Sequence, residues 1–178
     1  RGVWRDPQKY EEKYFTLNNK KTKFYITGDS AIKYGDGTIK ILGRSDDVIK
    51  VAGHRLSTAE LEDAVHSHPL VGDVAVVSKP DQLKGEAIVI FARLKSEAID
   101  ENKLKYEIIQ IIIKGIGPIA KPKEIYFVSD LPKTRSGKIM RRILKSLLRN
   151  EPLGELSTIV NPDCIENIKK KLESSKPL

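Results

Sequence analysis

The sequence predicts a small sandwich of strands and helices, of the α+β or α/β class, preceded by a β-rich segment. Apolar residues make up 39% of its 178 residues, which is enough to bury a core. Runs rich in strand-forming residues alternate along the chain with stretches of helical period. Two turns that contain glycine, Tyr34–Gly37 and Ala52-Gly53, each lie between two strand-like runs, as in β-hairpins.

The first part of the chain predicts short paired strands. Residues 1–23 are polar and show no clear period, whereas Phe24–Thr27 resembles a strand that ends at Gly28-Asp29. The Asp-Gly pair in the next turn tolerates positive φ, so we expect a return strand over Thr38–Leu42. Gly43–Asp47 interrupts the pattern and marks a predicted domain boundary.

The middle of the chain predicts a second hairpin, a helix and two buried strands. Ser57–Glu60 has the pattern of a capping box that opens a helix, and Pro69 ends that helix. The expected strands are 48–51 and 54–56 in the hairpin, then Val74–Val77 and Ala87–Leu94, with a loop over Lys79–Gly85.

The last part predicts two helices and a strand around a polar loop. The expected elements are a helix at Lys103–Lys114, a strand at Lys123–Val128, a loop at Asp130–Gly137 and an amphipathic helix at Ile139–Arg149. We expect residues 150–178 to form a polar tail with a weak helix at Asp163–Leu172.

Positive charge is concentrated in the second half of the chain. The formal net charge is +8, and residues 91–178 carry 18 basic and 11 acidic side chains, against 14 and 13 in residues 1–90. Such a field attracts nucleic acid, an acidic membrane or a small phosphorylated ligand, although a solvated helix face explains a charge run equally well. Seven basic residues lie within 130–149: Lys133, Arg135, Lys138, Arg141, Arg142, Lys145 and Arg149.

The composition excludes several classes of protein. No apolar run reaches the ~18–20 residues of a membrane span, and we expect neither a membrane segment nor a signal peptide. The single cysteine, Cys164, excludes an internal disulfide and a cysteine-built zinc site, and it fits a reducing, cytoplasmic compartment. The chain begins at Arg1 rather than at Met, so we expect a piece of a longer protein.

Two places could bind parts of a nucleotide. Asp29 follows a predicted strand and a glycine, so its carboxylate could accept hydrogen bonds from vicinal hydroxyls, or serve only as a turn residue. Arg44 and Arg55 lie beside glycine turns, and a planar, permanently charged guanidinium suits phosphate. The alternative for these arginines is an ordinary hairpin surface.

Two further places carry candidate chemistry. His66 and His68 could ligate a metal, although two histidines at this spacing near a helix end are more often surface residues. Lys138 ends a polar loop at the start of a predicted helix, where the helix dipole disfavours a cation, so we expect it to face an anion. The loop is not a P-loop, because Ile139 follows Lys138 where Ser or Thr is required.

Three motifs together resemble the last signature motifs of the AMP-forming adenylate enzymes, the family of acyl-CoA synthetases, peptide-synthetase adenylation domains and luciferases. They are Tyr25–Asp29, Gly43–Leu56 with Glu60 and Glu62, and Pro132–Lys138. Ile116–Ala120, Lys138–Leu144 and Leu153–Thr158 with Asn161-Pro162 resemble the acetyl-CoA synthetase branch. The resemblance covers almost the whole chain.

The resemblance implies an α+β fold, with a small mobile C-terminal domain whose short β-sheet is flanked by helices. By this reading residues 1–44 end the large N-terminal adenylation domain, residues 45–150 form the mobile domain, and residues 151–178 are the tail. The family uses ATP and Mg²⁺ to convert a carboxylate into an acyl-adenylate, from which coenzyme A takes the acyl group. The pyrophosphate loop and the adenine and acyl pockets would lie in the missing N-terminal domain.

The resemblance also implies a role for each matching residue. Asp29 would hold the ribose hydroxyls, Arg44 would contact ribose or phosphate, and Arg55 would reach the nucleotide phosphate. Asp46 would be the hinge about which the domain turns. Lys138 would be catalytic, binding the carboxylate and the α-phosphate, and it matches the lysine whose acetylation silences such enzymes, which makes an acetyltransferase and a deacetylase expected partners.

The remaining implied contacts concern CoA and a metal. Ala52 and Gly53 would line the pantetheine tunnel. The carbonyls of His66 and Val71 and the side chain of His68 would hold a structural Mg²⁺. Two departures weaken the CoA contact, since relatives often have Ser where Ala52 stands and Arg where Ile113 stands. Lys114, beside Ile113, could take over that phosphate contact.

The function expected from the resemblance is that of an acetate–CoA ligase, although this chain alone should be inactive. A ligase for propionate or a hydroxy acid is one alternative, because the acyl pocket lies outside the chain. A freestanding basic binding module without catalysis is another. The positive loop lacks the interleaved aromatic residues of single-strand binders, so we expect no nucleic-acid partner and no membrane partner.

Overall fold

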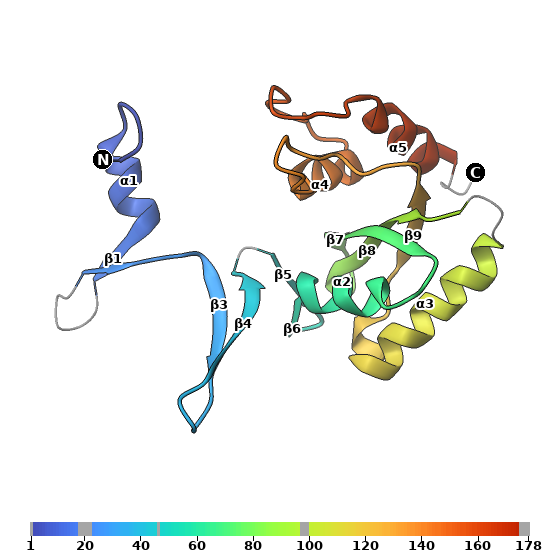
Figure 1. Ribbon diagram of the computed structural model, residues 1–178, viewed down its shortest axis with the longest axis horizontal. Coiled ribbons are helices and arrows are strands. Elements are labelled where there is room, and N and C mark those ends of the chain that lie inside the picture. Colours follow the sequence, from blue (N-terminus) through green and yellow to red (C-terminus); the bar gives the residue numbers. More distant parts are fainter. Residues whose placement is uncertain (1, 18–22, 46, 97–99, 175–178) are drawn as a thin grey trace. The chain divides into compact units, whose positions relative to one another are not determined.

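The protein, seen in a computed structural model, has an α+β fold that divides into two compact units, residues 1–46 and 47–178 (Figure 1). The structure describes residues 2–17, 23–45, 47–96 and 100–174. None of its helices in these ranges is long and apolar enough to cross a membrane. The two units are described in turn.

The first unit contains a helix and two small antiparallel ladders. Its elements are α1 (Pro7–Tyr14), β1 (Phe15–Leu17), β2 (Lys23–Tyr25), β3 (Asp29–Lys33) and β4 (Ile39–Arg44). Strand β1 pairs with β2, and β3 pairs with β4. No side chain described in this unit is buried, so its described residues form no core of their own.

Two features of this unit differ from the sequence-based expectation. The aperiodic start contains α1, whose N-cap Asp6 accepts a hydrogen bond from the Lys9 amide at 3.0 Å and whose first residue is Pro7. The strand that pairs across the Tyr34–Gly37 turn is β3, so Asp29 begins a strand rather than following one.

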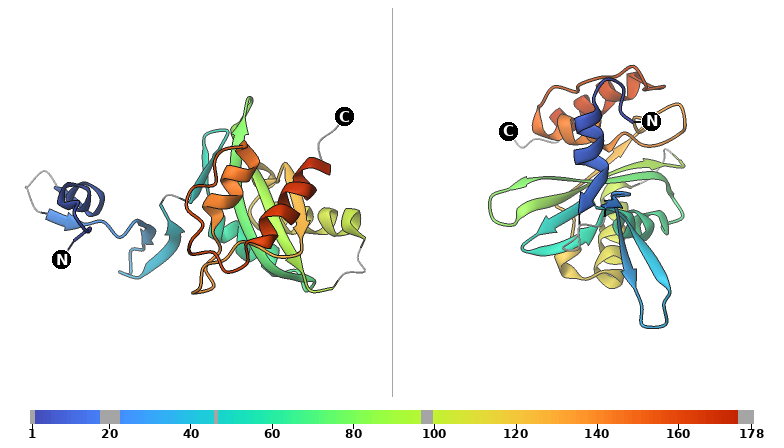
Figure 2. Two further views of the ribbon diagram at one scale, coloured as in Figure 1. Left: turned by 90° about the horizontal axis from the view of Figure 1, so that it is seen from above. Right: turned by 90° about the vertical axis from the view of Figure 1, so that its left-hand side faces the viewer.

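The second unit is a five-stranded sheet with a pair of helices on each face (Figure 2). Its strands are β5 (Val48–Val51), β6 (His54–Ser57), β7 (Val71–Asp81), β8 (Gly85–Leu94) and β9 (Glu124–Val128). Its helices are α2 (Thr58–His66), α3 (Glu101–Gly115), α4 (Arg141–Arg149) and α5 (Asp163–Ser174), with a 3₁₀ turn, η1, at Pro118–Ala120.

Strand β8 organises the sheet. One of its edges pairs with β7 along its length, and the other edge is shared by β5, at Val51 and Gly85, and by β9. Strand β9 runs parallel to β8, because α3 provides the long crossover that a parallel pair requires. The β5–β6 and β7–β8 pairings are antiparallel hairpins, and β5 pairs with β8 in an antiparallel contact between distant parts of the chain.

Alternating side chains of the strands build a separate core on each face of the sheet. In β8, Ile88 and Ile90 face the core formed with α2 and α3, whereas Val89 and Phe91 face the core formed with α4 and α5. Both cores are closed by fully buried helical side chains, such as Ile108 of α3 and Leu144 from α4. The unit is therefore a three-layer sandwich.

Several predicted boundaries needed correction. Strands β7 and β8 extend through most of the expected 79–85 loop, leaving only Gln82–Lys84 between them. Helix α4 begins at Arg141, not at Ile139. The weak helix expected near 163–172 is confirmed as α5, but residues 151–174 are no polar tail, because Cys164, Ile165 and Ile168 are buried in the second core.

Candidate functional site

Lys138 lies on a tight turn between β9 and α4. The Thr134 amide donates to the Lys138 carbonyl at 2.9 Å, and the Lys138 amide donates to Thr134 Oγ1 at 3.2 Å. Gly137 has φ +79°, a conformation that favours glycine, and no atom lies within 4 Å of a Cβ placed there. The Lys138 side chain is exposed, and no described group pairs with its ammonium. The turn thus presents Lys138, together with Arg135, to solvent.

The base of this turn is closed by polar contacts. The Met140 amide donates to the Pro132 carbonyl at 2.7 Å, and residues Lys133 and Ile139 form an antiparallel bridge. The Lys133 ammonium donates to Asp73 at 2.9 Å and to Asp130 at 3.2 Å. Lys133 holds the pKa of the Asp73 carboxyl below its ordinary value, with a second contribution from Arg93 at 2.8 Å.

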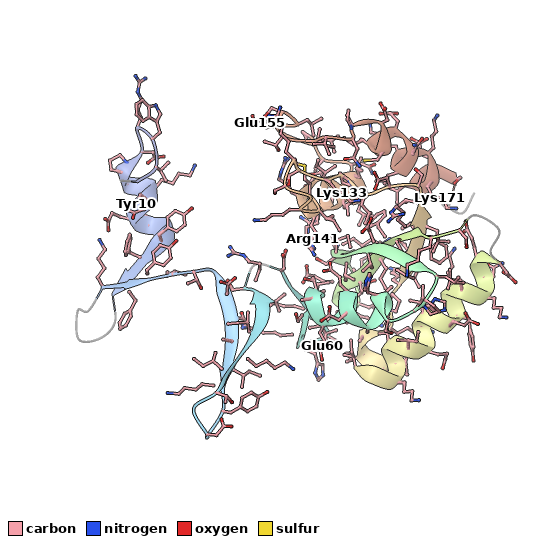
Figure 3. The ribbon with its side chains drawn as sticks, in the orientation of Figure 1. Tyr10, Glu60, Lys133, Arg141, Glu155 and Lys171 are labelled. Carbon is pink, nitrogen blue, oxygen red and sulfur yellow. The ribbon has the colours of Figure 1, made fainter. Side chains whose placement is uncertain are left out.

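Four of the seven basic residues within 130–149, a set that includes Lys138, are neutralised or engaged within the fold. Arg141, which is labelled in Figure 3, forms a bidentate pair with Glu62, at 2.9 and 2.6 Å. Lys145 lies 3.8 Å from Asp47, and Arg142 donates to backbone carbonyls. Only Arg135, Lys138 and Arg149 show no such partner in the described part of the chain. The charge run is therefore largely an internal network rather than a continuous basic surface.

Lys138 does not lie at a helix N-terminus. Because α4 begins at Arg141, the helix-dipole argument applied to Lys138 was wrong. Lys138 is instead exposed on an anchored turn, which it shares with Arg135.

Asp29 and Arg44 are brought together in the first unit. They are cross-strand partners at the end of β3 and β4, and Arg44 Nη1 lies 3.4 Å from Asp29 Oδ1 and donates to the Thr27 carbonyl at 2.8 Å. A Cβ on Gly28 would meet Arg44 Nη2 at 2.6 Å, so glycine leaves the room that the guanidinium occupies. The Asp29 side chain is 41% exposed, so its carboxylate can still accept hydrogen bonds from the hydroxyls of a ligand.

The β5–β6 turn presents backbone rather than functional side chains. Ala52 and Gly53 both have positive φ, +45° and +85°, and the Ala52 amide donates to the Lys84 carbonyl at 2.9 Å. Arg55 is exposed on β6, opposite Lys50. A narrow ligand arm could pass along this turn, because the two residues add little side-chain bulk, and an exposed Arg55 could meet a phosphate.

The predicted metal ligands lie at the end of α2 and the start of β7. His68 is 8% exposed, its Nε2 lies 3.1 Å from Glu107, and its Nδ1 accepts from the Leu70 amide at 3.3 Å. His66 is exposed and Val71 is buried in the first core. A cation at His68 would have to displace one of these two contacts. Within the described residues, no three His, Cys, Asp or Glu side chains cluster as metal ligands.

The predicted sites fall into four separate groups, of which the candidate metal ligands His66, His68 and Val71 are one. Asp29 and Arg44 meet in the first unit, while Arg55 with Ala52-Gly53, and Lys138, occupy separate turns of the second unit. Asp46 lies outside the described residues, so its hinge role stays a prediction.

Sequence reasoning missed the residues that hold the Lys138 turn. Asn161 donates from Nδ2 to Asp130 Oδ2 at 2.7 Å and to the Leu131 carbonyl at 2.8 Å, and its Oδ1 accepts from the Lys133 amide at 3.0 Å. In the sequence, Lys133 is only one of the seven basic residues within 130–149. The Asn161-Pro162 pair before a helix was the one local signal, since Asn before Pro is typical of a structured turn.

Comparison with known proteins agrees with this arrangement. The AMP-binding enzyme C-terminal domain matches residues 60–138. The acetyl-coenzyme A synthetase of Pyrobaculum arsenaticum is 48% identical over 98% of this chain and 26% of its own length. That of Methanothrix thermoacetophila is 46% identical over 94% of this chain and 26% of its own length. The chain thus spans about a quarter of the length of these curated relatives.

A solved structure extends the comparison to the fold. An ATP-bound RpMatB-BxBclM chimera matches 84% of this chain and 29% of its own, with a TM-score of 0.71 and 27% identity. The family match spans the segment from α2 to the Lys138 turn, which contains most of the first core and the anchored loop. Residues 60–138 therefore match the AMP-binding enzyme C-terminal domain, and almost the whole chain is similar to the C-terminal portion of acetyl-coenzyme A synthetases.

Proposed function

We propose that the chain is the C-terminal part of an acetate–CoA ligase, which makes acetyl-CoA from acetate, ATP and CoA by way of acetyl-AMP and releases AMP and pyrophosphate. The observation that carries this proposal is the Lys138 turn, which presents an exposed ammonium above an anchored base. The relatives named above are acetyl-coenzyme A synthetases, which supports acetate as the acid.

In the first half-reaction, Lys138 would lie between the attacking carboxylate and the α-phosphate. Negative charge develops on the phosphate oxygens as the bond forms, and a preorganised cation stabilises that charge. Asp29, next to Arg44 in the β3–β4 ladder, would accept hydrogen bonds from the ribose hydroxyls. Arg55 would contact the nucleotide phosphate.

In the second half-reaction, the thiol of CoA attacks the acyl carbon of acetyl-AMP and AMP leaves. The Ala52-Gly53 turn would line the path of the pantetheine arm, since it offers backbone and little side-chain volume. Asp46 would be the hinge about which the domain rotates, and this rotation would replace Lys138 at the reaction site by the Ala52-Gly53 turn. Mg²⁺ would neutralise phosphate charge when bound, and a structural Mg²⁺ would use the carbonyls of His66 and Val71 with the ring of His68.

The first unit supports the proposal that a large domain of the same protein is the partner. It leaves apolar side chains exposed that a folded protein normally covers. The exposed side chains include Phe24, Tyr25, Ile26, Ile32, Tyr34, Ile39 and Ile41. In this proposal the unit is the end of that larger domain, whose remaining strands would cover these residues.

Regulation and location belong to the same proposal. Acetylation of Lys138 by an acetyltransferase would remove its charge and silence the first half-reaction, and a deacetylase would restore it. The exposure of Lys138 allows such enzymes to reach it. A reducing cytoplasmic location fits the single buried Cys164.

The test uses the longer protein that contains this chain. We expect acetate-dependent exchange of pyrophosphate into ATP, and formation of acetyl-CoA when CoA is added, while the 178-residue chain alone catalyses neither. Propionate and a short hydroxy acid, assayed in parallel, identify the acid. Absence of exchange with every acid tested, together with salt-sensitive binding to DNA or RNA, would instead support the basic binding module.

A further inference from the structure

A segment near the C-terminus contacts residues on both sides of the Lys138 turn. We name residues 153–162, which connect α4 to α5, the C-terminal strap. At one end of the strap, Asn161 contacts Asp130, Leu131 and Lys133, which precede the turn. At the other end, the strap carbonyls of Leu153 and Glu155 accept hydrogen bonds from Arg142, which follows the turn.

The backbone of the strap adds to these side-chain contacts. The Val160 amide donates to the Lys133 carbonyl at 3.0 Å, and Ile159 forms an antiparallel bridge with Thr134. Thr134 is the residue that closes the turn onto Lys138 through its amide and its hydroxyl. Thr134 therefore connects the strap directly to Lys138, since it contacts both.

The strap is itself fixed by packing. Leu153, Leu156 and Ile159 pack against the second core, and α5, which begins directly after the strap, buries Ile165 and Ile168 in the same core. A rigid support on both sides of a loop limits the positions that the loop can adopt. The strap adds to the restraints within the turn, which are the Thr134 and Pro132 contacts and the Lys133–Ile139 bridge.

We infer that Asn161 is a positioning residue, which fixes the base of the Lys138 turn from the C-terminal strap. The catalytic consequence of this role rests on the function proposed above, whereas the anchoring itself does not. Asn161 suits the role because its amide donates to the Asp130 carboxylate and the Leu131 carbonyl, while its oxygen accepts from the Lys133 amide. Aspartate at this position would keep the acceptor and lose both donors.

The first experiment measures the anchoring in the 178-residue chain. Amide hydrogen exchange is followed in wild type, in Asn161→Asp, and in Asn167→Asp, which makes the same chemical change at an exposed position of α5. We expect the Lys133 and Val160 amides to exchange about 10-fold faster or more in Asn161→Asp, and to be unchanged in Asn167→Asp. Unchanged exchange in Asn161→Asp would overturn the inference, whatever the chain's function.

A swap of the two side chains distinguishes a specific contact from general destabilisation. In the double variant Asn161→Asp with Asp130→Asn, the amide of residue 130 can donate to the new carboxylate, while its oxygen still accepts from the Leu131 amide. We expect this swap to recover much of the lost protection. If the loss of amide protection in the double variant equals the sum of the losses in the two single variants, the contact has no specific role.

The second experiment measures catalysis in the longer protein. Asn161→Asp should lower acetyl-adenylate formation about 10-fold. It should leave thioester formation from supplied acetyl-AMP and CoA unchanged, a split that a purely structural defect would not produce. Equal loss in both half-reactions would overturn the positioning role. If Lys138→Ala has no effect on adenylation while the exchange result holds, the proposed function fails and the anchoring stands.

Discussion

At the scale of single residues, the lack of an internal partner among the described residues separates Lys138, Arg135 and Arg149 from the other cations of residues 130–149. Lys133 pairs with the carboxylates of Asp73 and Asp130, and Arg141 pairs with that of Glu62. Lys133 has its pKa raised, first by the Asp73 carboxylate that accepts its hydrogen bond. The exposed turn of Lys138 offers no such carboxylate among the described residues. A cation in this situation can meet a ligand anion without first breaking an internal ion pair.

The first prediction concerns Lys138. Lys138→Ala in the longer protein should lower acetyl-adenylate formation by about 10²–10³-fold, because one preorganised charge is lost from the developing phosphate charge. Thioester formation from supplied acetyl-AMP should stay close to wild type. Arg149→Ala, which removes another exposed cation from the same charge run, is the control and should change neither half-reaction. A loss below a few-fold for Lys138→Ala would show that Lys138 is a solvated surface residue.

The second prediction concerns the positive φ of Gly53. No atom lies within 4 Å of a Cβ on Gly53, so Gly53→Ala has no steric clash, and its cost is about 1–2 kcal/mol of backbone strain. Gly115→Ala, at the end of α3, also meets no atom, but its φ is not positive, so it should stabilise by about 0.4–1 kcal/mol. Urea unfolding of the chain measures both free energies. Equal effects of the two variants would contradict the strain argument.

At the scale of elements, an ion pair connects α2 to the N-terminus of α4. Glu62 accepts from Arg141 through both carboxylate oxygens and also accepts from the Val76 amide of β7 at 2.9 Å. The Glu62 side chain is only 14% exposed and that of Arg141 is 28% exposed. Since the two helices lie on opposite faces of the sheet, this pair passes beside the β7 edge and joins both layers.

The third prediction tests this pair with a double-mutant cycle. Glu62→Gln, Arg141→Met and the double variant should give a coupling energy of about 1–3 kcal/mol, because each partner leaves the other unpaired in a partly buried site. The exposed Lys169–Glu166 pair, 43% and 65% exposed, is the control and should give about 0.2–0.5 kcal/mol. Urea unfolding supplies the free energies. A coupling for Glu62–Arg141 no larger than the control would mean that the pair is not structural.

At the scale of the whole molecule, the two units differ in what holds them together. The second unit has two cores, while the described side chains of the first unit include none that is buried. The aromatic residues of the first unit do contact one another, as in the stack of Tyr14 on Tyr25, whose ring centroids are 5.9 Å apart. Such exposed contacts remove little apolar surface from water, so they stabilise little.

The fourth prediction is that the second unit supplies the whole cooperative transition. A chain of residues 47–178 should unfold in urea at the same midpoint, with the same slope, as the 178-residue chain. Amides of β3 and β4 should show little protection from hydrogen exchange in the longer of the two chains. A midpoint that falls by more than the experimental error on removal of residues 1–46 would show that the first unit contributes to stability.

The fifth prediction is a loss of stability in acid. The pKa of Asp81 is lowered from 3.8 to about 2, first by a hydrogen bond from Lys123, and that of Asp73 is lowered by Lys133 and Arg93. Because each folded pKa is below the unfolded one, their contribution is complete above about pH 4 and is lost as the pH falls toward 2. Unfolding free energies from pH 6 to 2.5 should therefore fall below pH 4, and less steeply in Asp81→Asn and Asp73→Asn. Variants as steep as wild type would contradict this assignment.

Some of these features were determined by the sequence alone. The two glycine turns, the Ser57 cap of α2 and the apolar period of α3 depend on residues within a few positions, so the order of elements in the second unit was predicted correctly. The residue types of the motifs identified the family, because the matches depend on local spacing. Helix α1 was not predicted, because its only local signal was the Asp6-Pro7 pair and its apolar residues show no helical period.

The tertiary structure alone decided what holds the candidate catalytic turn. Asn161 and Asp130 are 31 positions apart, and Glu62 and Arg141 are 79 apart, so no periodic pattern relates them. The same holds for the sharing of one β8 edge by β5 and β9, and for the burial of α5 where the polar composition predicted a tail. Local spacing sets the turn, the cap and the period of each element. Pairing across the fold depends on which buried faces meet, and that is set only when the sheet brings distant elements together.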